Sequence, residues 1–118
     1  MIIMDNVLNK LVGLGIPGLI FFYVFATCGY YGAAAITFSL AAIGPGGMIG
    51  GVATLVLAGL ISSALAEYGF DKLNEAIVNE FKNRGKSKED ILNWINSRWY
   101  ISGSKKAYLR ELINEYYS

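Results

Sequence analysis

The chain has 118 residues, of which 54% are hydrophobic and 16% charged, and its formal net charge is +1. This length fits one domain, or one small domain joined to a membrane part. The sequence has no histidine and one cysteine, Cys28, which excludes a Cys/His metal site and an intrachain disulfide. With a small net charge and no dense basic run, a nucleic-acid-binding arm is not expected.

The charges are distributed unevenly along the chain. Residues 1–66 carry two of them, Asp5 and Lys10, whereas residues 67–118 carry nine basic and eight acidic side chains. Residues 11–66 form a run of 56 residues without Asp, Glu, Lys or Arg, although soluble domains usually carry about 25% charge. We interpret this as two environments, lipid around the first part and water around the second.

Residues 1–15 are predicted to form a short amphipathic helix. Apolar side chains recur every three or four positions and share one helical face, opposite a polar face. The apolar set is Ile3, Val7, Leu8, Leu11 and Leu14, and the polar set is Asp5, Asn6, Asn9 and Lys10. Such a helix lies either in the headgroup plane of a membrane or against a protein core. Gly15 and Pro17 predict a bend after it, because Pro17 suits the first turn of a following helix.

Residues 16–67 are predicted to form a hydrophobic membrane hairpin that bends at its glycines. The first arm has two interpretations. It is either one helix of about 26 residues, 18–43, long enough to cross a bilayer with tilt, or two shorter helices separated at Gly29 and Gly32. The two tyrosines between these glycines favour the break, because tyrosine prefers the membrane interface to the bilayer centre.

The bend of the hairpin is predicted at residues 44–47, Gly-Pro-Gly-Gly, the strongest turn signal in the chain. The second arm, residues 48–66, is an apolar segment of 19 residues, close to the minimum for a membrane span. Glu67 ends the uncharged run, and Tyr68 and Gly69 are expected to stop the helix at the interface.

Small residues recur every four positions around and after this bend. In a helix this spacing forms a face on which two backbones can approach closely, and in lipid such packing supplies much of the attraction between helices. The predicted packing positions are Gly46, Gly47, Gly50, Gly51, Ala58, Ser62 and Ala66. Gly59 and Ser63 form a further pair with the same spacing. The spacing does not distinguish packing within one hairpin from packing between copies in a homo-oligomer.

Residues 68–118 are predicted to form a water-soluble cap of three short amphipathic helices. The first covers residues 70–83, and Gly85 fits the position that follows a helix end. Ser87 is the expected N-cap of the second helix, with acidic residues in its first turn. The third begins near Lys105, after a Ser-Gly-Ser turn. Each helix is short and needs a partner surface to be stable.

Two groups of side chains in the cap are candidates for contact with a membrane or a partner. Lys82, Arg84, Lys86 and Lys88 form a basic stretch that is either a solvated turn or a contact for anionic headgroups, at about 1 kcal/mol per charge. The aromatic residues are expected to form the small core of the cap, and an alternative places some of them at the headgroup level or on a partner. They are Trp94, Trp99, Tyr100, Tyr116 and Tyr117.

A soluble form remains an alternative, because a helix that is apolar all round is buried either in lipid or in protein. The 52 residues after residue 66 would have difficulty covering 56 uncharged ones, so a soluble form would require a large oligomer. No phosphate-binding loop, nucleophile elbow or dinucleotide motif occurs in the sequence, and neither an enzyme nor a cofactor is expected.

The sequence therefore predicts an all-α membrane protein with both termini on one side, which the basic residues of the cap suggest is cytoplasmic. The first functional hypothesis is a homo-oligomeric protein that forms a pore or perturbs the bilayer, in the manner of holins or cell-suicide effectors. The alternative is a non-catalytic, membrane-anchored scaffold, immunity or regulatory subunit whose C-terminal helices bind a protein partner.

Overall fold

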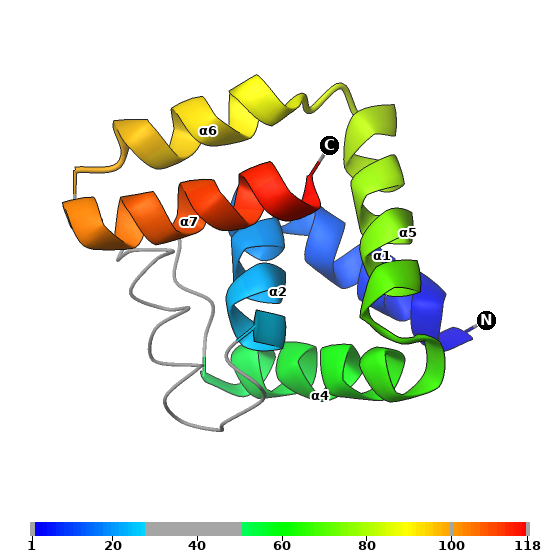
Figure 1. Ribbon diagram of the computed structural model, residues 1–118. Helices are drawn as coiled ribbons and strands as arrows, with labels where there is room; N and C mark the ends of the chain where they lie inside the picture. Colours follow the sequence, from blue (N-terminus) through cyan, green and yellow to red (C-terminus); the bar gives the residue numbers. More distant parts are fainter. Residues whose placement is uncertain (1, 28–50, 100, 118) are drawn as a thin grey trace.

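The structure is a computed structural model that describes residues 2–27, 51–99 and 101–117. All regular structure in these ranges is helical, and no strand occurs in them, so the predicted all-α class is confirmed (Figure 1). The helices are α1 (Ile2–Gly13), α2 (Ile16–Thr27), α4 (Gly51–Tyr68), α5 (Phe70–Asn83), α6 (Lys88–Ser97) and α7 (Gly103–Tyr116).

The connection between α1 and α2 follows the predicted Gly–Pro bend. Gly15 has a φ of +76°, a conformation that glycine adopts without steric cost, and Pro17 lies in the first turn of α2. At Gly18 the two helices come so close that a Cβ atom would lie 2.1 Å from the carbonyl oxygen of Leu11. Leu14 was expected on the apolar face of α1 but is 39% exposed, because α1 ends at Gly13.

The local signals around α5 and α6 act as predicted. Gly85 has a φ of +79° after the end of α5, where the amides of Gly85 and Lys86 donate to the carbonyls of Lys82 and Phe81, which is a Schellman motif. Ser87 then begins α6 with a capping box, in which its hydroxyl accepts from the Asp90 amide and the Asp90 carboxylate accepts from the Ser87 amide.

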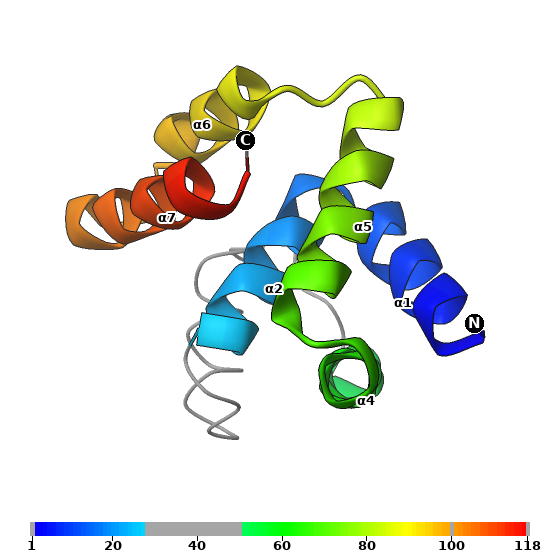
Figure 2. The ribbon, with the colours of Figure 1, turned by 45° about the vertical axis from the view of Figure 1, so that its right-hand side comes forward.

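Helix α2 lies at the centre of the molecule in both views (Figures 1 and 2). Helix α1 packs against α2, α4 and α5, while α6 and α7 form an antiparallel pair whose second member reaches α2. One hydrophobic core contains buried side chains from Met4 in α1 to Tyr117 after α7. The amphipathic segment, the hydrophobic segment and the cap of the sequence prediction all contribute to this core.

The predicted membrane spans receive no support from the structure. Across residues 2–27, 51–99 and 101–117, no helix combines the length and the apolarity that crossing a membrane requires. The proposed break at Gly29 and Gly32 and the bend at residues 44–47 lie outside the described residues. Of the predicted hairpin, the structure describes α2, which begins at Ile16, and α4, which begins at Gly51.

Candidate functional site

The central feature of the molecule is the burial of α2, which has no polar face. Ile16 and the eight consecutive residues 18–25 are all buried. The amphipathic helices α1 and α7 pack against it, and α5 reaches it through Phe70 and Asn74. On α5, Leu73, Ile77 and Phe81 are buried in the same core. Amphipathic helices of the same chain therefore cover a helix that the sequence assigned to lipid.

Aromatic rings make the contact between α2 and its cover. The rings of Phe22 and Phe70 stack with centroids 5.6 Å apart. The Tyr23 ring stacks on that of Tyr116 at the same centroid distance, 5.6 Å, and Phe70 meets Tyr116 edge-on at 4.8 Å. Ring pairs at these separations contribute about 0.5–1.5 kcal/mol each beyond their buried area. This cluster joins α2, the start of α5 and the end of α7.

Two side-chain hydrogen bonds also hold α2 to the cover, and we name them the α2 polar contacts. The Tyr23 hydroxyl donates to Oδ1 of Asn74 in α5 at 2.6 Å, and the hydroxyls of Thr27 and Tyr108 in α7 lie 2.9 Å apart. Asn74 in turn donates from Nδ2 to the Tyr116 carbonyl oxygen at 3.0 Å. Tyr23 is fully buried, and a buried polar group without a partner costs about 1–3 kcal/mol, so its bond to Asn74 favours this position of α2.

The predicted packing positions are only partly described. Gly46, Gly47 and Gly50 lie outside the described residues, and Gly51 is the first residue of α4. Ala58 is buried in the core, Ser62 is half-buried and Ala66 is exposed. These three do not share one surface. Between residues 56 and 68, the outward face of α4 instead carries the exposed residues, which are Val56, Gly59, Ser63, Ala66 and Glu67.

The basic stretch divides into two parts in the structure. A hollow of about 570 Å³ lies at the turn between α5 and α6, and we name it the lysine hollow. Three of the four predicted cations line it, whereas Arg84 pairs with Glu80 across one helical turn, with Nε 3.3 Å from Oε1. The lining residues are Lys82, Gly85, Lys86, Ser87, Lys88, Glu89 and Tyr117.

Tyr117 is a part of the lysine hollow that the sequence did not indicate. Its ring is fully buried, the Lys82 ammonium lies 5.9 Å from the ring centroid, and its hydroxyl donates to the Lys86 carbonyl oxygen. Burial raises the pKa of the Tyr117 phenol, and the nearby Asp90 carboxylate adds to the rise. Tyr117 therefore acts as a neutral donor that fixes the turn on which the lysines are carried.

The pair α6–α7 separates the two tryptophans into different environments. Trp94 is half-buried, and the Arg98 guanidinium carbon lies 4.4 Å from its ring centroid. Trp99, in the turn, is 86% exposed. From α7, Lys106 Nζ donates to the Asn96 carbonyl oxygen at 3.0 Å, and Arg110 donates to the Asn96 side chain at 2.8 Å. These bonds hold the two helices together beside the turn.

The described part of the chain contains no cluster of metal-binding side chains. Among residues 2–27, 51–99 and 101–117, no group of three or more His, Cys, Asp or Glu side chains is placed to hold a metal ion. Comparison of the chain with protein-family models, curated proteins and solved structures gave no match. The features of the structure that bear on function are the burial of α2, the outward face of α4 and the surfaces of the cap.

Proposed function

We propose that this is a non-catalytic protein that acts on lipid bilayers. In water α2 is buried beneath the amphipathic helices, and at a membrane the cover opens and the apolar segment enters the lipid. The single observation that carries the proposal is that α2, which is apolar on every side, is buried at the centre of a cover whose helices are amphipathic. The cap is proposed to remain on the cytoplasmic side of the membrane.

The two environments available to α2 differ little in hydrophobic free energy. Exposing it to water would cost about 25 cal/mol for each Å² of apolar surface, whereas protein core and lipid both avoid that cost. A helix of twelve residues is about 18 Å long and does not cross a hydrocarbon core of about 30 Å by itself. The uncharged sequence continues from α2 to residue 66, which supplies the additional length.

We name the arrangement in which α2 is buried the closed state, and the arrangement in which α2 has entered the lipid the open state. The amphipathic helices have a suitable environment in both states. In the closed state α5 meets α2 through Phe70 and Asn74, and its apolar stripe is buried in the same core. In the open state the same stripe can lie at the boundary between headgroups and acyl chains, as interfacial helices do. The α2 polar contacts are what the transition must break, since Tyr23 and Thr27 lose their partners on α5 and α7.

Self-assembly is the second part of the proposal, and the outward face of α4 supports it. A Cβ atom at Gly59 would meet nothing within 4 Å, and Ser63 and Ala66 continue this small, exposed surface as far as the exposed Glu67. Small residues allow helix backbones to approach closely in lipid. We propose that copies of the chain associate through this face and produce a homo-oligomer that perturbs or perforates the bilayer.

The proposal is tested with the purified full-length chain and vesicles that contain a self-quenched dye. We expect dye release that rises with protein concentration, together with protein that stays in the vesicle pellet after a carbonate wash. Light scattering in detergent should then give a particle larger than one copy. If the protein neither releases dye nor resists the carbonate wash, the proposal is wrong.

A second candidate function is favoured by the lysine hollow. Three lysines and one carboxylate, that of Glu89, line the hollow, and this excess of positive charge would suit an acidic protein partner of a scaffold or regulatory subunit. Expression that leaves cells polarised, with a partner that co-purifies with the wild type but not with Lys86→Gln, would favour this candidate over bilayer disruption.

A further inference from the structure

The turn between α6 and α7 exposes the largest apolar side chain of the described surface. Trp99 is 86% exposed, although a tryptophan side chain buries about 150–250 Å² when it is covered. Trp94, five residues earlier, is half-buried beside Arg98, so the exposure of Trp99 is not general to this helix pair. We name the turn and its flanks the hairpin tip, which consists of Arg98, Trp99, Ile101, Ser102, Gly103, Ser104 and Lys105.

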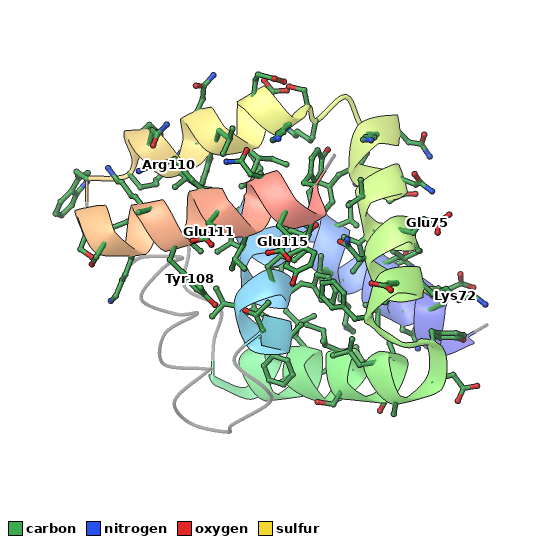
Figure 3. The ribbon with its side chains drawn as sticks, viewed as in Figure 1. Lys72, Glu75, Tyr108, Arg110, Glu111 and Glu115 are labelled. Carbon is green, nitrogen blue, oxygen red and sulfur yellow. The ribbon has the colours of Figure 1, made fainter. Side chains whose placement is uncertain are left out.

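The surroundings of the hairpin tip are cationic. Residues 91–110, which include most of α6 and the first half of α7, contain four basic and no acidic side chains. Two of the four are fixed close to the tip, because Lys106 and Arg110 both bond to Asn96. Arg110 lies on the far side of the molecule from Lys72 in α5 (Figure 3). One of the two clusters of positive charge in the cap thus lies at the end of the α6–α7 pair where Trp99 is exposed, and the other lies at the lysine hollow.

We infer that the hairpin tip is a docking element for an anionic bilayer surface. Trp99 would lie at the headgroup level, where tryptophan is enriched in membrane proteins, and the four cations would face lipid phosphates. Each cation near an anionic membrane increases binding about fivefold. Stable protein partners bury about 800 Å² per side, much more than one aromatic side chain offers, so the tip fits an interfacial anchor better than a protein interface.

The inference deepens the proposed action on bilayers, on which it rests, by naming the surface that makes first contact. It is tested with Trp94→Phe, which leaves Trp99 as the single tryptophan of the chain. We expect its emission to shift to the blue with phosphatidylglycerol vesicles, much less with phosphatidylcholine vesicles, and to be quenched by lipids brominated near the headgroup. High salt should weaken the effect, because it screens the charges.

Two substitutions measure how much Trp99 and Lys105 each contribute to vesicle binding. Trp99→Ser should weaken binding to phosphatidylglycerol vesicles about tenfold, and Lys105→Gln about fivefold. Lys72→Gln makes the same charge change away from the tip and should leave binding unchanged. The circular dichroism of each variant checks that it is folded.

Vesicle binding and dye release are measured separately, so the two proposals can fail separately. Binding by the wild type that Trp99→Ser weakens supports the tip, even where no dye is released. Dye release by the wild type with undiminished binding of Trp99→Ser overturns the tip alone. The tip is also overturned if Trp99 emission responds equally to neutral and anionic vesicles, or if the wild type binds neither.

Discussion

The hydroxyl of Tyr23 donates a 2.6 Å hydrogen bond to Oδ1 of Asn74, and this bond joins the apolar helix α2 to the amphipathic helix α5. The same Asn74 donates from Nδ2 to the carbonyl oxygen of Tyr116. One amide side chain therefore connects residues from three helices that are far apart in the sequence. Since Tyr23 is fully buried, its hydroxyl depends on Asn74 for a hydrogen-bond partner, and this favours the observed position of α2.

The first prediction concerns this hydrogen bond. Tyr23→Phe keeps the stacked ring and removes the hydroxyl, so it should lower the free energy of unfolding by about 1 kcal/mol, as measured by urea denaturation. Because the bond holds α2 closed, the variant should also release vesicle dye at lower protein concentration than the wild type. Tyr116→Phe is the matched control, since its hydroxyl takes no part in the α2 polar contacts. Equal dye release by Tyr23→Phe and Tyr116→Phe would contradict the role given to this bond.

The second prediction compares two glycines in different surroundings. Gly18→Ala should destabilise the protein by about 1–3 kcal/mol, because the added Cβ would lie 2.1 Å from the backbone oxygen of Leu11. Gly59→Ala should instead stabilise it by up to about 1 kcal/mol, because nothing lies within 4 Å of that Cβ and alanine is the better helix former. Thermal unfolding followed by circular dichroism measures both. A Gly18→Ala variant at least as stable as the wild type would contradict the close contact between α1 and α2.

The third prediction tests the outward face of α4. Gly59→Leu should leave the monomer folded, since the position is open, but should reduce the particle size in detergent, because a bulky side chain keeps two backbones apart. Asn79→Leu, on the exposed side of α5, controls for added surface hydrophobicity. An oligomer of unchanged size in Gly59→Leu would exclude this face as the contact between copies.

The fourth prediction is a pH dependence at the start of α6. The backbone amide of Ser87, and then its hydroxyl, bond to Asp90 and lower the pKa of its carboxyl. A carboxyl whose pKa is lower in the folded state stabilises the protein above its unfolded pKa of about 3.9 and loses this contribution as the pH falls towards the folded value. Unfolding by urea between about pH 6 and pH 3 should therefore show a smaller loss of stability for Asp90→Asn than for the wild type. Identical pH profiles for the wild type and Asp90→Asn would show that the Asp90 carboxylate does not stabilise the folded state through the capping box.

Local structure could be predicted from the sequence because its causes are local. Gly85, Ser87 and the stripe of residues 70–83 lie within a few residues of the backbone groups they satisfy, and the structure confirms them. The partner of Tyr23, by contrast, is 51 residues away. Neither helical periodicity nor capping signals indicate which residues 51 positions apart will be in contact. The burial of α2 by other helices was therefore not predicted, and the uncharged run suggested lipid instead.

The packing positions illustrate a second limit of sequence patterns. Ala58, Ser62 and Ala66 are spaced by four residues, but a helix has 3.6 residues per turn, so each step rotates by about 40°. Two steps accumulate about 80°, which is enough to move from the buried face at Ala58 to the exposed face at Ala66. A repeat of four defines one face only over a short length. The sequence indicated both Gly59 with Ser63 and Ala58 with Ser62 and Ala66 as small-residue pairs, but the structure was needed to show which of these residues face outward.

The central claim, that α2 must separate from its cover to act on a bilayer, is tested most directly by a cleavable tether. Thr27→Cys and Tyr108→Cys, whose hydroxyls lie 2.9 Å apart in the wild type, would be joined by a short cleavable thiol cross-linker in a chain that also carries Cys28→Ser. We predict that the tethered protein binds vesicles without releasing their dye, and that release returns to the level of the untethered variant once the linker is cleaved. Equal dye release before and after cleavage would contradict the account.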